Sequence, residues 1–351
     1  MCIRDRSNIY IVAEIGCNHN GSVDIAREMI LKAKEAGVNA VKFQTFKADK
    51  LISAIAPKAE YQIKNTGELE SQLEMTKKLE MKYDDYLHLM EYAVSLNLDV
   101  FSTPFDEDSI DFLASLKQKI WKIPSGELLN LPYLEKIAKL PIPDKKIIIS
   151  TGMATIDEIK QSVSIFINNK VPVDNITILH CNTEYPTPFE DVNLNAINDL
   201  KKHFPKNNIG FSDHSSGFYA AIAAVPYGIT FIEKHFTLDK SMSGPDHLAS
   251  IEPDELKHLC IGVRCVEKSL GSNSKVVTAS ERKNKIVARK SIIAKTEIKK
   301  GEVFSEKNIT TKRPGNGISP MEWYNLLGKI AEQDFIPDEL IIHSEFKNQG
   351  E

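Results

Sequence analysis

Short apolar runs, each ending in a cluster of polar residues, recur along most of the chain. The first two cover residues 9–13 and 39–44, and two later ones cover residues 209–211 and 229–232. Helical patterns separate most of these runs. Between the first two, residues 22–37 place apolar side chains at helical spacing and end at a glycine, a common helix terminator. The alternation predicts repeated strand–helix–strand units with parallel strands.

Eight strands of this kind are expected by residue 236, which is the number in a (β/α)8 barrel, also called a TIM barrel. We assign this barrel to residues 9–270. A doubly wound sheet is the alternative, but no GxGxxG pattern follows the first strand. In the barrel fold the active site lies at the carboxyl ends of the strands, where the polar clusters fall. The polar stretch 48–77 is predicted to be irregular and to form a lid over that site.

The two ends of the chain differ from the barrel in character. Residues 271–287 are polar and are predicted to be a linker. Residues 288–351 contain short β-like segments and turns, which predict a small β-rich second domain. Residues 1–8 fit none of these elements and are expected to be a non-native or disordered leader.

Composition and charge narrow the functional classes. The chain of 351 residues has a formal net charge of -4, 26% charged residues of interspersed sign and no basic stripe, so we expect no nucleic-acid partner. No apolar run approaches the roughly 18 residues of a membrane span, and we recognise no signal peptide, so we expect a cytoplasmic protein without a membrane partner. The five cysteines have no CxxC spacing and indicate neither a zinc site nor a disulfide framework.

Two histidines, His214 and His235, each follow one of the apolar runs and stand beside ionisable neighbours. If both runs are parallel strands, the two imidazoles emerge from the same end of one sheet and can share a metal ion. Each histidine could instead be a hydrogen-bonded residue at a strand end, and both interpretations stay open. As metal ligands without a cysteine, they favour a catalytic divalent ion such as manganese, magnesium or cobalt over structural zinc.

Lysines and hydroxyls at other strand ends suit an anion. Lys42 and Lys122 lie near the ends of two short apolar strands. The hydroxyls at equivalent places are those of Thr103, Ser125, Ser150 and Ser212. A surface lysine is normally only solvated, but two lysines and several hydroxyls at one barrel mouth would form a site for phosphate or carboxylate. The acidic groups Glu14, Glu127 and Asp246 in the same layer suit metal binding, acid–base catalysis or the hydroxyls of a sugar.

Several motifs resemble those of the sialic acid synthase family. In the predicted barrel they are AEIGCNHNGS (13–22), VKFQTF (41–46), STPFD (102–106), KIPSGE (122–127), STGM (150–153), EYPTP (184–188), FSDHS (211–215), EKHFTLDK (233–240) and GPDH (244–247). The segments RKSIIAKTEIKKGEVF (289–304) and KRPGNGI (312–318) are similar to the antifreeze-like, or SAF, domain of that family. The resemblance covers nearly the whole chain from residue 9 onward.

The resemblance implies a transferase that forms a carbon–carbon bond and depends on phosphoenolpyruvate and a metal. Family members condense phosphoenolpyruvate and water with an N-acyl mannosamine-type sugar, giving a nine-carbon nonulosonic acid and phosphate. By position, His214 and His235 resemble the metal ligands, and Glu14 would lie near the metal and the attacking water. The residues that resemble the phosphoenolpyruvate site are Lys42, Thr103, Lys122, Ser125, Ser150 and Ser212. The residues that resemble sugar contacts are Gln44, Glu127, Tyr185 and Asp246.

The resemblance also implies an assembly. Family members are domain-swapped homodimers in which the small domain covers the active site of the partner. In such a dimer, Arg313 is the residue expected to reach the N-acyl group of the sugar.

The exact sugar depends on two positions. Members that make N-acetylneuraminate from N-acetylmannosamine often have a histidine in place of Phe43 and an asparagine in place of Thr183. Phe43 and the stretch NTEYP resemble the branch that makes N,N'-diacetyllegionaminate from 2,4-diacetamido-2,4,6-trideoxymannose, and an apolar residue suits a deoxy carbon. These positions favour legionaminate over neuraminate.

The alternative on the same barrel is a metal-free Schiff-base pyruvate aldolase with Lys42 or Lys122 as its nucleophile.

Overall fold

The computed structural model describes residues 8–67 and 69–346. The chain divides into two compact units between Gly271 and Ser272, and each unit is described by itself. Seven of the eight residues of the predicted leader, 1–7, lie outside the described residues.

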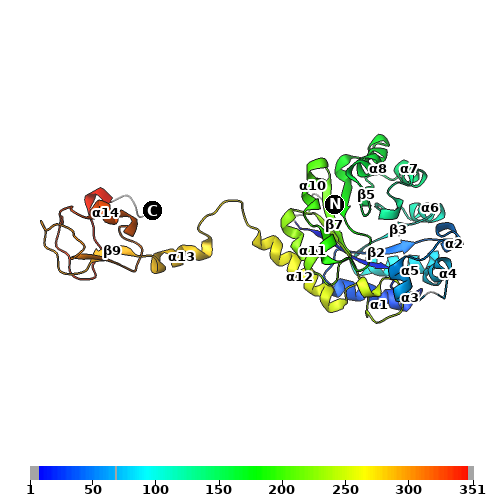
Figure 1. Ribbon diagram of the computed structural model, residues 1–351, viewed down its shortest axis with the longest axis horizontal. Helices are drawn as coiled ribbons and strands as arrows, with labels where there is room; N and C mark the ends of the chain where they lie inside the picture. The colour runs from blue at the N-terminus through cyan, green and yellow to red at the C-terminus, as the bar shows by residue number, and fades with distance from the viewer. Residues whose placement is uncertain (1–7, 68, 347–351) are drawn as a thin grey trace. The chain divides into compact units, whose positions relative to one another are not determined.

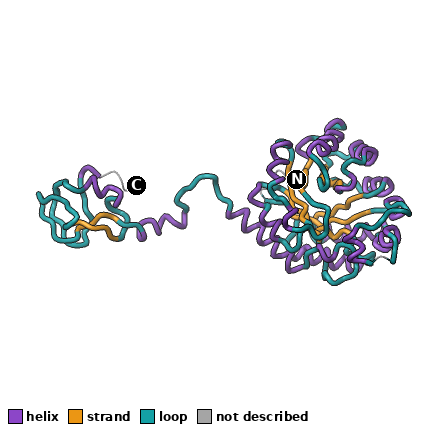
Figure 2. Tube along the Cα trace, in the orientation of Figure 1, coloured by secondary structure: helices purple, strands orange, loops and turns teal. Residues whose placement is uncertain are grey.

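The first unit is built on eight parallel strands arranged in the order β3-β2-β1-β8-β7-β6-β5-β4. The strands are β1 (Tyr10–Gly16), β2 (Ala40–Thr45), β3 (Asp99–Pro104), β4 (Ile120–Ile123), β5 (Lys146–Ser150), β6 (Ile176–His180), β7 (Asn208–Asp213) and β8 (Phe231–His235). Because β3 and β4, at the two ends of this order, also contact each other, the sheet closes on itself. Figures 1 and 2 show the strands inside a ring of helices, which confirms the predicted (β/α)8 barrel.

A glutamine side chain joins the barrel at the β3–β4 seam. The backbone N–H of Ser102 on β3 donates to Oε1 of Gln118 at 2.8 Å, and Nε2 of Gln118 donates to the carbonyl of Ser102 at 2.9 Å. A primary amide offers one donor and one acceptor in the same geometry as a peptide group. The side chain of Gln118 therefore satisfies backbone groups of β3 that would otherwise need a partner strand.

The helices pack around this barrel and bury their apolar faces against it. The longer ones are α1 (Val23–Ala36), α5 (Tyr83–Ser95), α6 (Glu107–Ser115), α7 (Leu131–Lys139), α8 (Ile156–Asn168), α10 (Ala196–His203) and α12 (Pro253–Ser269). The two shorter ones that close the ring are α9 (Phe189–Val192) and α11 (Tyr219–Ala223). The predicted boundaries of α1 are confirmed, because Ser22 caps its first turn and Gly37 ends it in the left-handed conformation at φ 93°.

The stretch predicted to be irregular between β2 and α5 is helical instead. It contains α2 (Ala48–Leu51), α3 (Glu60–Thr66) and α4 (Gln72–Leu79). The last of these begins with a capping box, in which the Ser71 hydroxyl accepts from the Glu74 N–H at 3.2 Å and a Glu74 carboxylate oxygen accepts from the Ser71 N–H at 2.9 Å. The sequence SQLE therefore carried a helix start signal. It was overlooked because no long helical repeat of apolar residues follows it.

The second unit is small and has its own core. Strands β9 (Ser291–Ala294) and β10 (Ile309–Lys312) form an antiparallel pair, and α14 (Trp323–Leu326) packs nearby. Buried side chains such as Ile292, Phe304 and Phe335 form its apolar centre. Helix α13 (Ala279–Ala288) lies largely within the segment predicted to be a plain linker, so that segment is partly helical.

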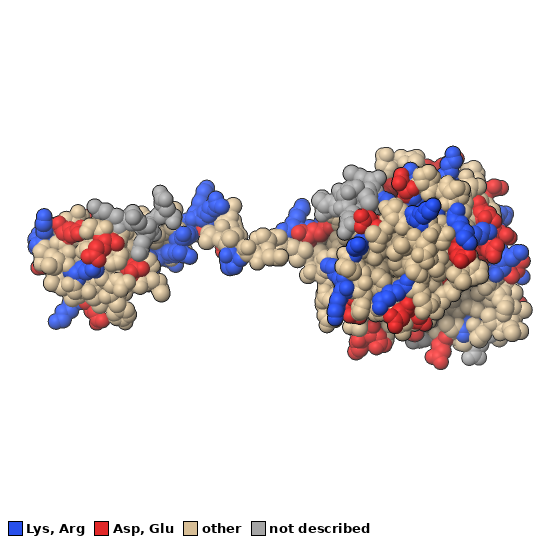
Figure 3. Space-filling view, turned by 90° about the horizontal axis from the view of Figure 1, so that it is seen from above, with Lys and Arg blue, Asp and Glu red and all other residues tan. Residues whose placement is uncertain are grey.

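The surface shows mixed charge. On the face of the first unit shown in Figure 3, basic and acidic side chains are interspersed instead of gathering in one stripe. Among the described residues, no helix has both the length and the apolar character needed to cross a bilayer.

Candidate active site

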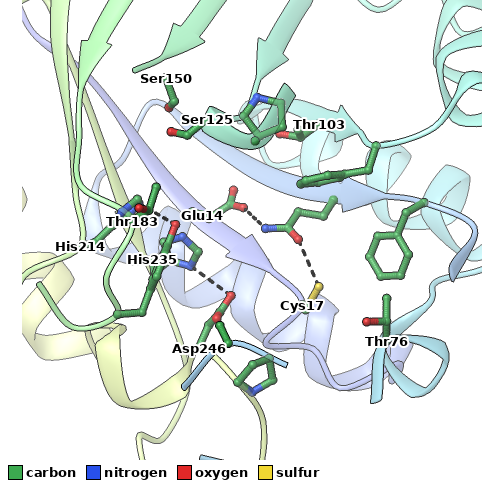
Figure 4. A pocket seen from close by; sticks show the side chains of 18 of the residues that line it. Glu14, Cys17, Thr76, Thr103, Ser125, Ser150, Thr183, His214, His235 and Asp246 are labelled. Atoms are coloured by element: carbon green, nitrogen blue, oxygen red, sulfur yellow. Dashed lines mark hydrogen bonds and ion pairs between the residues drawn. The ribbon is translucent and has the colours of Figure 1, made fainter. Parts of the chain in front are cut away.

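A cavity of about 520 Å³ opens at the carboxyl ends of the barrel strands (Figure 4). Its lining includes every residue of the first unit that the sequence predicted for the site except Phe43. These residues are Glu14, Lys42, Gln44, Thr103, Lys122, Ser125, Glu127, Ser150, Tyr185, Ser212, His214, His235 and Asp246. The volume suits a small polar substrate of the size of a monosaccharide together with a second small molecule.

Alternation along β2 decides which side chains reach the cavity. Lys42 and Gln44 point into it, and Phe43 between them points to the outer layer of the barrel. There the ring of Phe43 lies edge-on to Tyr86, with the centroids 5.8 Å apart, and only 1% of the side chain is exposed. The prediction that Phe43 contacts a deoxy carbon of the sugar is therefore wrong, because Phe43 belongs to the packing between β2 and the helices.

A cluster of buried lysines and glutamates forms the floor of the cavity. The ammonium nitrogen of Lys42 lies 2.9 Å from Glu14 Oε2 and 3.4 Å from Glu233 Oε2. The ammonium nitrogen of Lys122 lies 3.7 Å from Glu233 Oε1. Glu233 was not predicted as a site residue, although its position two residues before His235 on β8 was the signal, since alternate residues of a strand face the same side.

Hydroxyl groups surround the two lysines. Lys42 donates to Thr103 Oγ1 at 3.2 Å, and Lys122 donates to Ser150 Oγ at 2.6 Å. Ser212 Oγ donates to Glu233 Oε1 at 3.0 Å, and Ser125 Oγ accepts from the backbone N–H of Gly152 at 3.0 Å. Thr103, Ser125 and Ser150 are seen together on one side of Figure 4. The predicted anion-binding groups are thus close together in space.

Burial and charge set the protonation of this cluster. Burial by itself raises the pKa of Glu233, but the ammonium groups of Lys122 and Lys42 outweigh it and lower that pKa to about 2. Burial raises the pKa of Glu14 to about 7, against the opposing effect of Lys42. The pKa of Lys42 is raised, because Glu14 and Glu233 outweigh the effect of burial, whereas burial lowers the pKa of Lys122. Two lysines among these carboxyl groups suit an anionic ligand.

The two histidines lie side by side next to the lysine cluster. Their ring centroids are 5.3 Å apart. Nδ1 of His214 pairs with the backbone carbonyl of Asn182, so the hydrogen lies on Nδ1. The lone pair of Nε2 then faces the hydroxyls of Ser212 at 3.2 Å and Tyr185 at 3.4 Å. Nδ1 of His235 is buried and has no hydrogen-bond partner among the described residues.

Burial lowers the pKa of His214 to about 4 and that of His235 well below its usual value. Both imidazoles are therefore neutral at pH 7, the form that binds metals. In the part of the chain that the structure describes, no group of three or more His, Cys, Asp or Glu side chains is arranged to hold a metal. The donor set at this place is two neutral imidazoles, a ligand type that suits a divalent transition metal.

The residues predicted to contact a sugar lie around the histidines. Nε2 of Gln44 donates to Glu14 Oε1 at 2.9 Å, and the ring of Tyr185 stacks on His214 with centroids 4.2 Å apart. Asp246 Oδ2 is 3.9 Å from His235 Nδ1, and burial raises the pKa of Asp246 to about 6. Arg313 is an exposed residue of the second unit, and its role stays a prediction.

The helices between β2 and α5 cover part of the cavity, as the predicted lid would. Tyr61 of α3 lines the cavity and pairs with Tyr185, with ring centroids 5.3 Å apart. Nδ2 of Asn65, also on α3, donates to the carbonyl of Pro245 at 2.7 Å. Thr183, singled out in the sequence, also lines the cavity. The hydrogen bond from Asn65 to Pro245 connects the lid to the loop that carries Asp246.

The fold and the site together define a (β/α)8-barrel protein. Its cavity combines a lysine-containing site that suits an anion with a pair of neutral histidines. Comparisons with known proteins identify its family. The model of the NeuB family matches residues 29–275, and the model of the SAF domain matches residues 289–346. The chain belongs to the NeuB family, and the predicted family resemblance and SAF domain are confirmed.

Relatives match along nearly their whole length. The chain is 52% identical to an N,N'-diacetyllegionaminic acid synthase of Campylobacter jejuni, over 94% of this chain and 98% of the relative. It is 44% identical to an enzyme of the same name from Legionella pneumophila, over 91% and 89%. The crystal structure of an N-acetylneuraminic acid synthetase from Leptospira borgpetersenii, in complex with citrate, matches with a TM-score of 0.68 at 34% identity, over 79% and 90%.

Proposed function

We propose that this protein is an N,N'-diacetyllegionaminic acid synthase. It would condense phosphoenolpyruvate and water with 2,4-diacetamido-2,4,6-trideoxymannose and release phosphate. The observation that carries the proposal is the cavity itself, in which two buried lysines and several hydroxyls adjoin two neutral histidines. The identities of 52% and 44% to synthases of that name support this sugar over N-acetylmannosamine.

The lysine cluster would bind phosphoenolpyruvate. Lys42 and Lys122 are nearly completely buried, so their attraction for a phosphate or carboxylate is screened little by water. The hydroxyls that would complete this site are those of Thr103, Ser125, Ser150 and Ser212. Fixed donors around the ligand hold the enol carbon in one place and orientation, which lowers the entropy cost of the reaction.

His214 and His235 would hold the divalent cation, for which manganese is the first choice and magnesium or cobalt the alternatives. The fit rests on two neutral imidazoles and on the unpaired Nδ1 of His235. When bound, such an ion would supply Lewis-acid polarisation of the aldehyde of the open-chain sugar.

The sugar would lie against the residues around the histidines, which are Gln44, Glu127, Tyr185 and Asp246. The enol carbon of phosphoenolpyruvate attacks the aldehyde carbon, and a cationic centre develops at the carbon that bears the phosphate. Water adds to that carbon, and phosphate leaves by carbon–oxygen cleavage. Glu14 is suited to take the proton from this water, since its pKa is raised to about 7 and proton acceptors work best near the ambient pH.

We propose in addition that the enzyme acts in the cytoplasm as a domain-swapped homodimer. The second unit carries Arg313 on its surface, where a guanidinium group is free to bind an acyl oxygen presented by another subunit. Membership of the NeuB family and the SAF match support this assembly.

The test of the proposed function is phosphate release from phosphoenolpyruvate by metal-stripped protein to which manganese is restored. We expect turnover with 2,4-diacetamido-2,4,6-trideoxymannose and a lower kcat/KM with N-acetylmannosamine, whereas the opposite preference would make the protein a neuraminate synthase. His235→Ala should abolish the metal-dependent turnover. His203→Ala, which changes a surface histidine of α10 paired with Asp199 at 3.6 Å, is the matched control and should not.

The same assay separates the proposal from a Schiff-base aldolase. An aldolase would turn over without metal, and borohydride with pyruvate would trap Lys42 or Lys122 as a covalent adduct. Metal-independent turnover together with this adduct would refute the proposed function.

A further inference from the structure

One side of the active-site cavity is apolar and belongs to a small hydrophobic cluster separate from the barrel core. The cluster consists of Cys17, Phe46, Leu51, Leu79 and Phe105. All five residues also line the cavity, and we call them the apolar wall. The rings of its two phenylalanines meet edge to face with centroids 6.4 Å apart.

The wall is assembled from three strand ends and from the lid. Cys17, Phe46 and Phe105 each follow the last residue of a barrel strand, β1, β2 and β3. Leu51 ends α2 and Leu79 ends α4. In Figure 4, Cys17 of the wall and His214 lie on opposite sides of the view, with Glu14 between them.

The wall has almost no hydrogen-bonding capacity. Four of its side chains are hydrocarbon, and the thiol of Cys17 donates to Oε1 of Gln44 at 3.2 Å. Thr76, one helical turn before Leu79 on α4, is a hydroxyl at its edge. A polar group of the substrate placed against the wall would therefore lose its hydrogen bonds to water without replacement.

From this we infer that the apolar wall receives a methyl carbon of the acceptor sugar and so selects a 6-deoxy sugar. The inference rests on the proposed function. Of the groups on 2,4-diacetamido-2,4,6-trideoxymannose, each acetamido group carries an N–H and a carbonyl that need partners, whereas the methyl at carbon 6 needs none. The wall thus provides the apolar specificity contact that Phe43, which points out of the cavity, cannot provide.

Two acceptors that differ only at carbon 6 test the inference. They are 2,4-diacetamido-2,4,6-trideoxymannose and 2,4-diacetamido-2,4-dideoxymannose, compared by phosphate release with manganese present. We expect kcat/KM to favour the deoxy sugar by about 10–100-fold, since an apolar pocket rejects an added hydroxyl only to this extent. Equal kcat/KM values would overturn the inference and leave the proposed function standing. No phosphate with either sugar would instead refute the proposed function, and the inference with it.

Substitutions in the wall connect this preference to its residues. Leu51→Asn gives the wall a donor and an acceptor on a side chain with the same branching and the same number of heavy atoms, and should lower the preference at least about 5-fold. Leu51→Met should keep it. Phe105→Tyr is the second variant, at a half-buried position, and should act in the same direction as Leu51→Asn. Met153→Gln changes an exposed apolar residue of the cavity next to Gly152 and should leave the preference unchanged. A preference that survives in both Leu51→Asn and Phe105→Tyr would overturn the inference.

Discussion

Replacing Glu233 by glutamine is expected to destabilise the barrel strongly, because it removes the carboxylate that Lys42 and Lys122 share. Glutamine reproduces the shape of a neutral carboxyl group but not its charge. The pKa of Glu233 is lowered from 4.5 to about 2 in the folded state. At about 1.4 kcal/mol per pKa unit, the charge contributes roughly 3 kcal/mol to the free energy of unfolding at pH 7. For a unit of this size we expect the Tm to fall by about 5–10 °C.

Thermal unfolding followed by circular dichroism measures this effect. The folded pKa lies below the unfolded value, so the stabilisation by Glu233 is complete above pH 4.5 and is lost as the pH falls through about 2. The difference in Tm between wild type and variant should shrink over the same range. Glu107→Gln is the control, because Glu107 forms an exposed ion pair with Lys136 at 3.5 Å, and such pairs contribute little.

Added phosphoenolpyruvate should raise the Tm of Glu233→Gln more than that of the wild type, since the ligand then supplies the missing negative charge. A variant whose Tm stays within about 1 °C of the wild type, with the same ligand-induced shift, would refute the view that Glu233 compensates the two lysines.

Three further predictions address binding, pH and the lid. Lys122→Met should raise the KM for phosphoenolpyruvate about 10–100-fold, because a charged hydrogen bond is lost, and should change the KM for the sugar little. The surface variant Lys136→Met should change neither KM. An equal rise in both KM values of Lys122→Met would contradict the assignment of Lys122 to phosphoenolpyruvate. In metal-free protein, burial raises the pKa of Glu14 from 4.5 to about 7, so wild-type stability should fall by roughly 3 kcal/mol relative to Glu14→Gln as the pH rises from 4.5 to 7. If the Tm of the wild type and that of Glu14→Gln changed equally with pH, this prediction would be contradicted. Asn65→Ala removes the 2.7 Å bond to the Pro245 carbonyl and should speed hydrogen exchange in α3 about 5-fold, whereas unchanged exchange would show that this bond does not hold the lid.

Much of the fold could be predicted from local patterns. Runs of apolar residues bounded by polar clusters predicted the strands, since a parallel strand covered on both faces is apolar for most of its length. The last strand was misplaced by about two residues, because Glu233 and His235 look like a polar end but lie within β8. The lid helices were missed because they are short and their helical period is weak, even though Ser71 and Glu74 have capping-box spacing.

The site could be predicted less evenly, and strand alternation explains most of the differences. Residues directly at strand ends, such as Ser150 and His214, were found because their types and positions repeat. Glu233 was missed and Phe43 was misassigned for the same reason. Alternate residues of a strand face the cavity and the helices, and the sequence alone does not show which set faces the cavity. The role of Arg313 stays a prediction, since it depends on a second subunit.

The measurement that tests the central claim most directly is to follow the carbon atoms of phosphoenolpyruvate. Phosphoenolpyruvate labelled with 13C at its methylene carbon is incubated with manganese-loaded protein and 2,4-diacetamido-2,4,6-trideoxymannose, and the products are observed by NMR. We predict that the label moves from a vinyl carbon to the methylene at carbon 3 of a nine-carbon acid, with one phosphate released per label. Label that remains in phosphoenolpyruvate, or appears only in the methyl group of pyruvate, would contradict the proposed condensation.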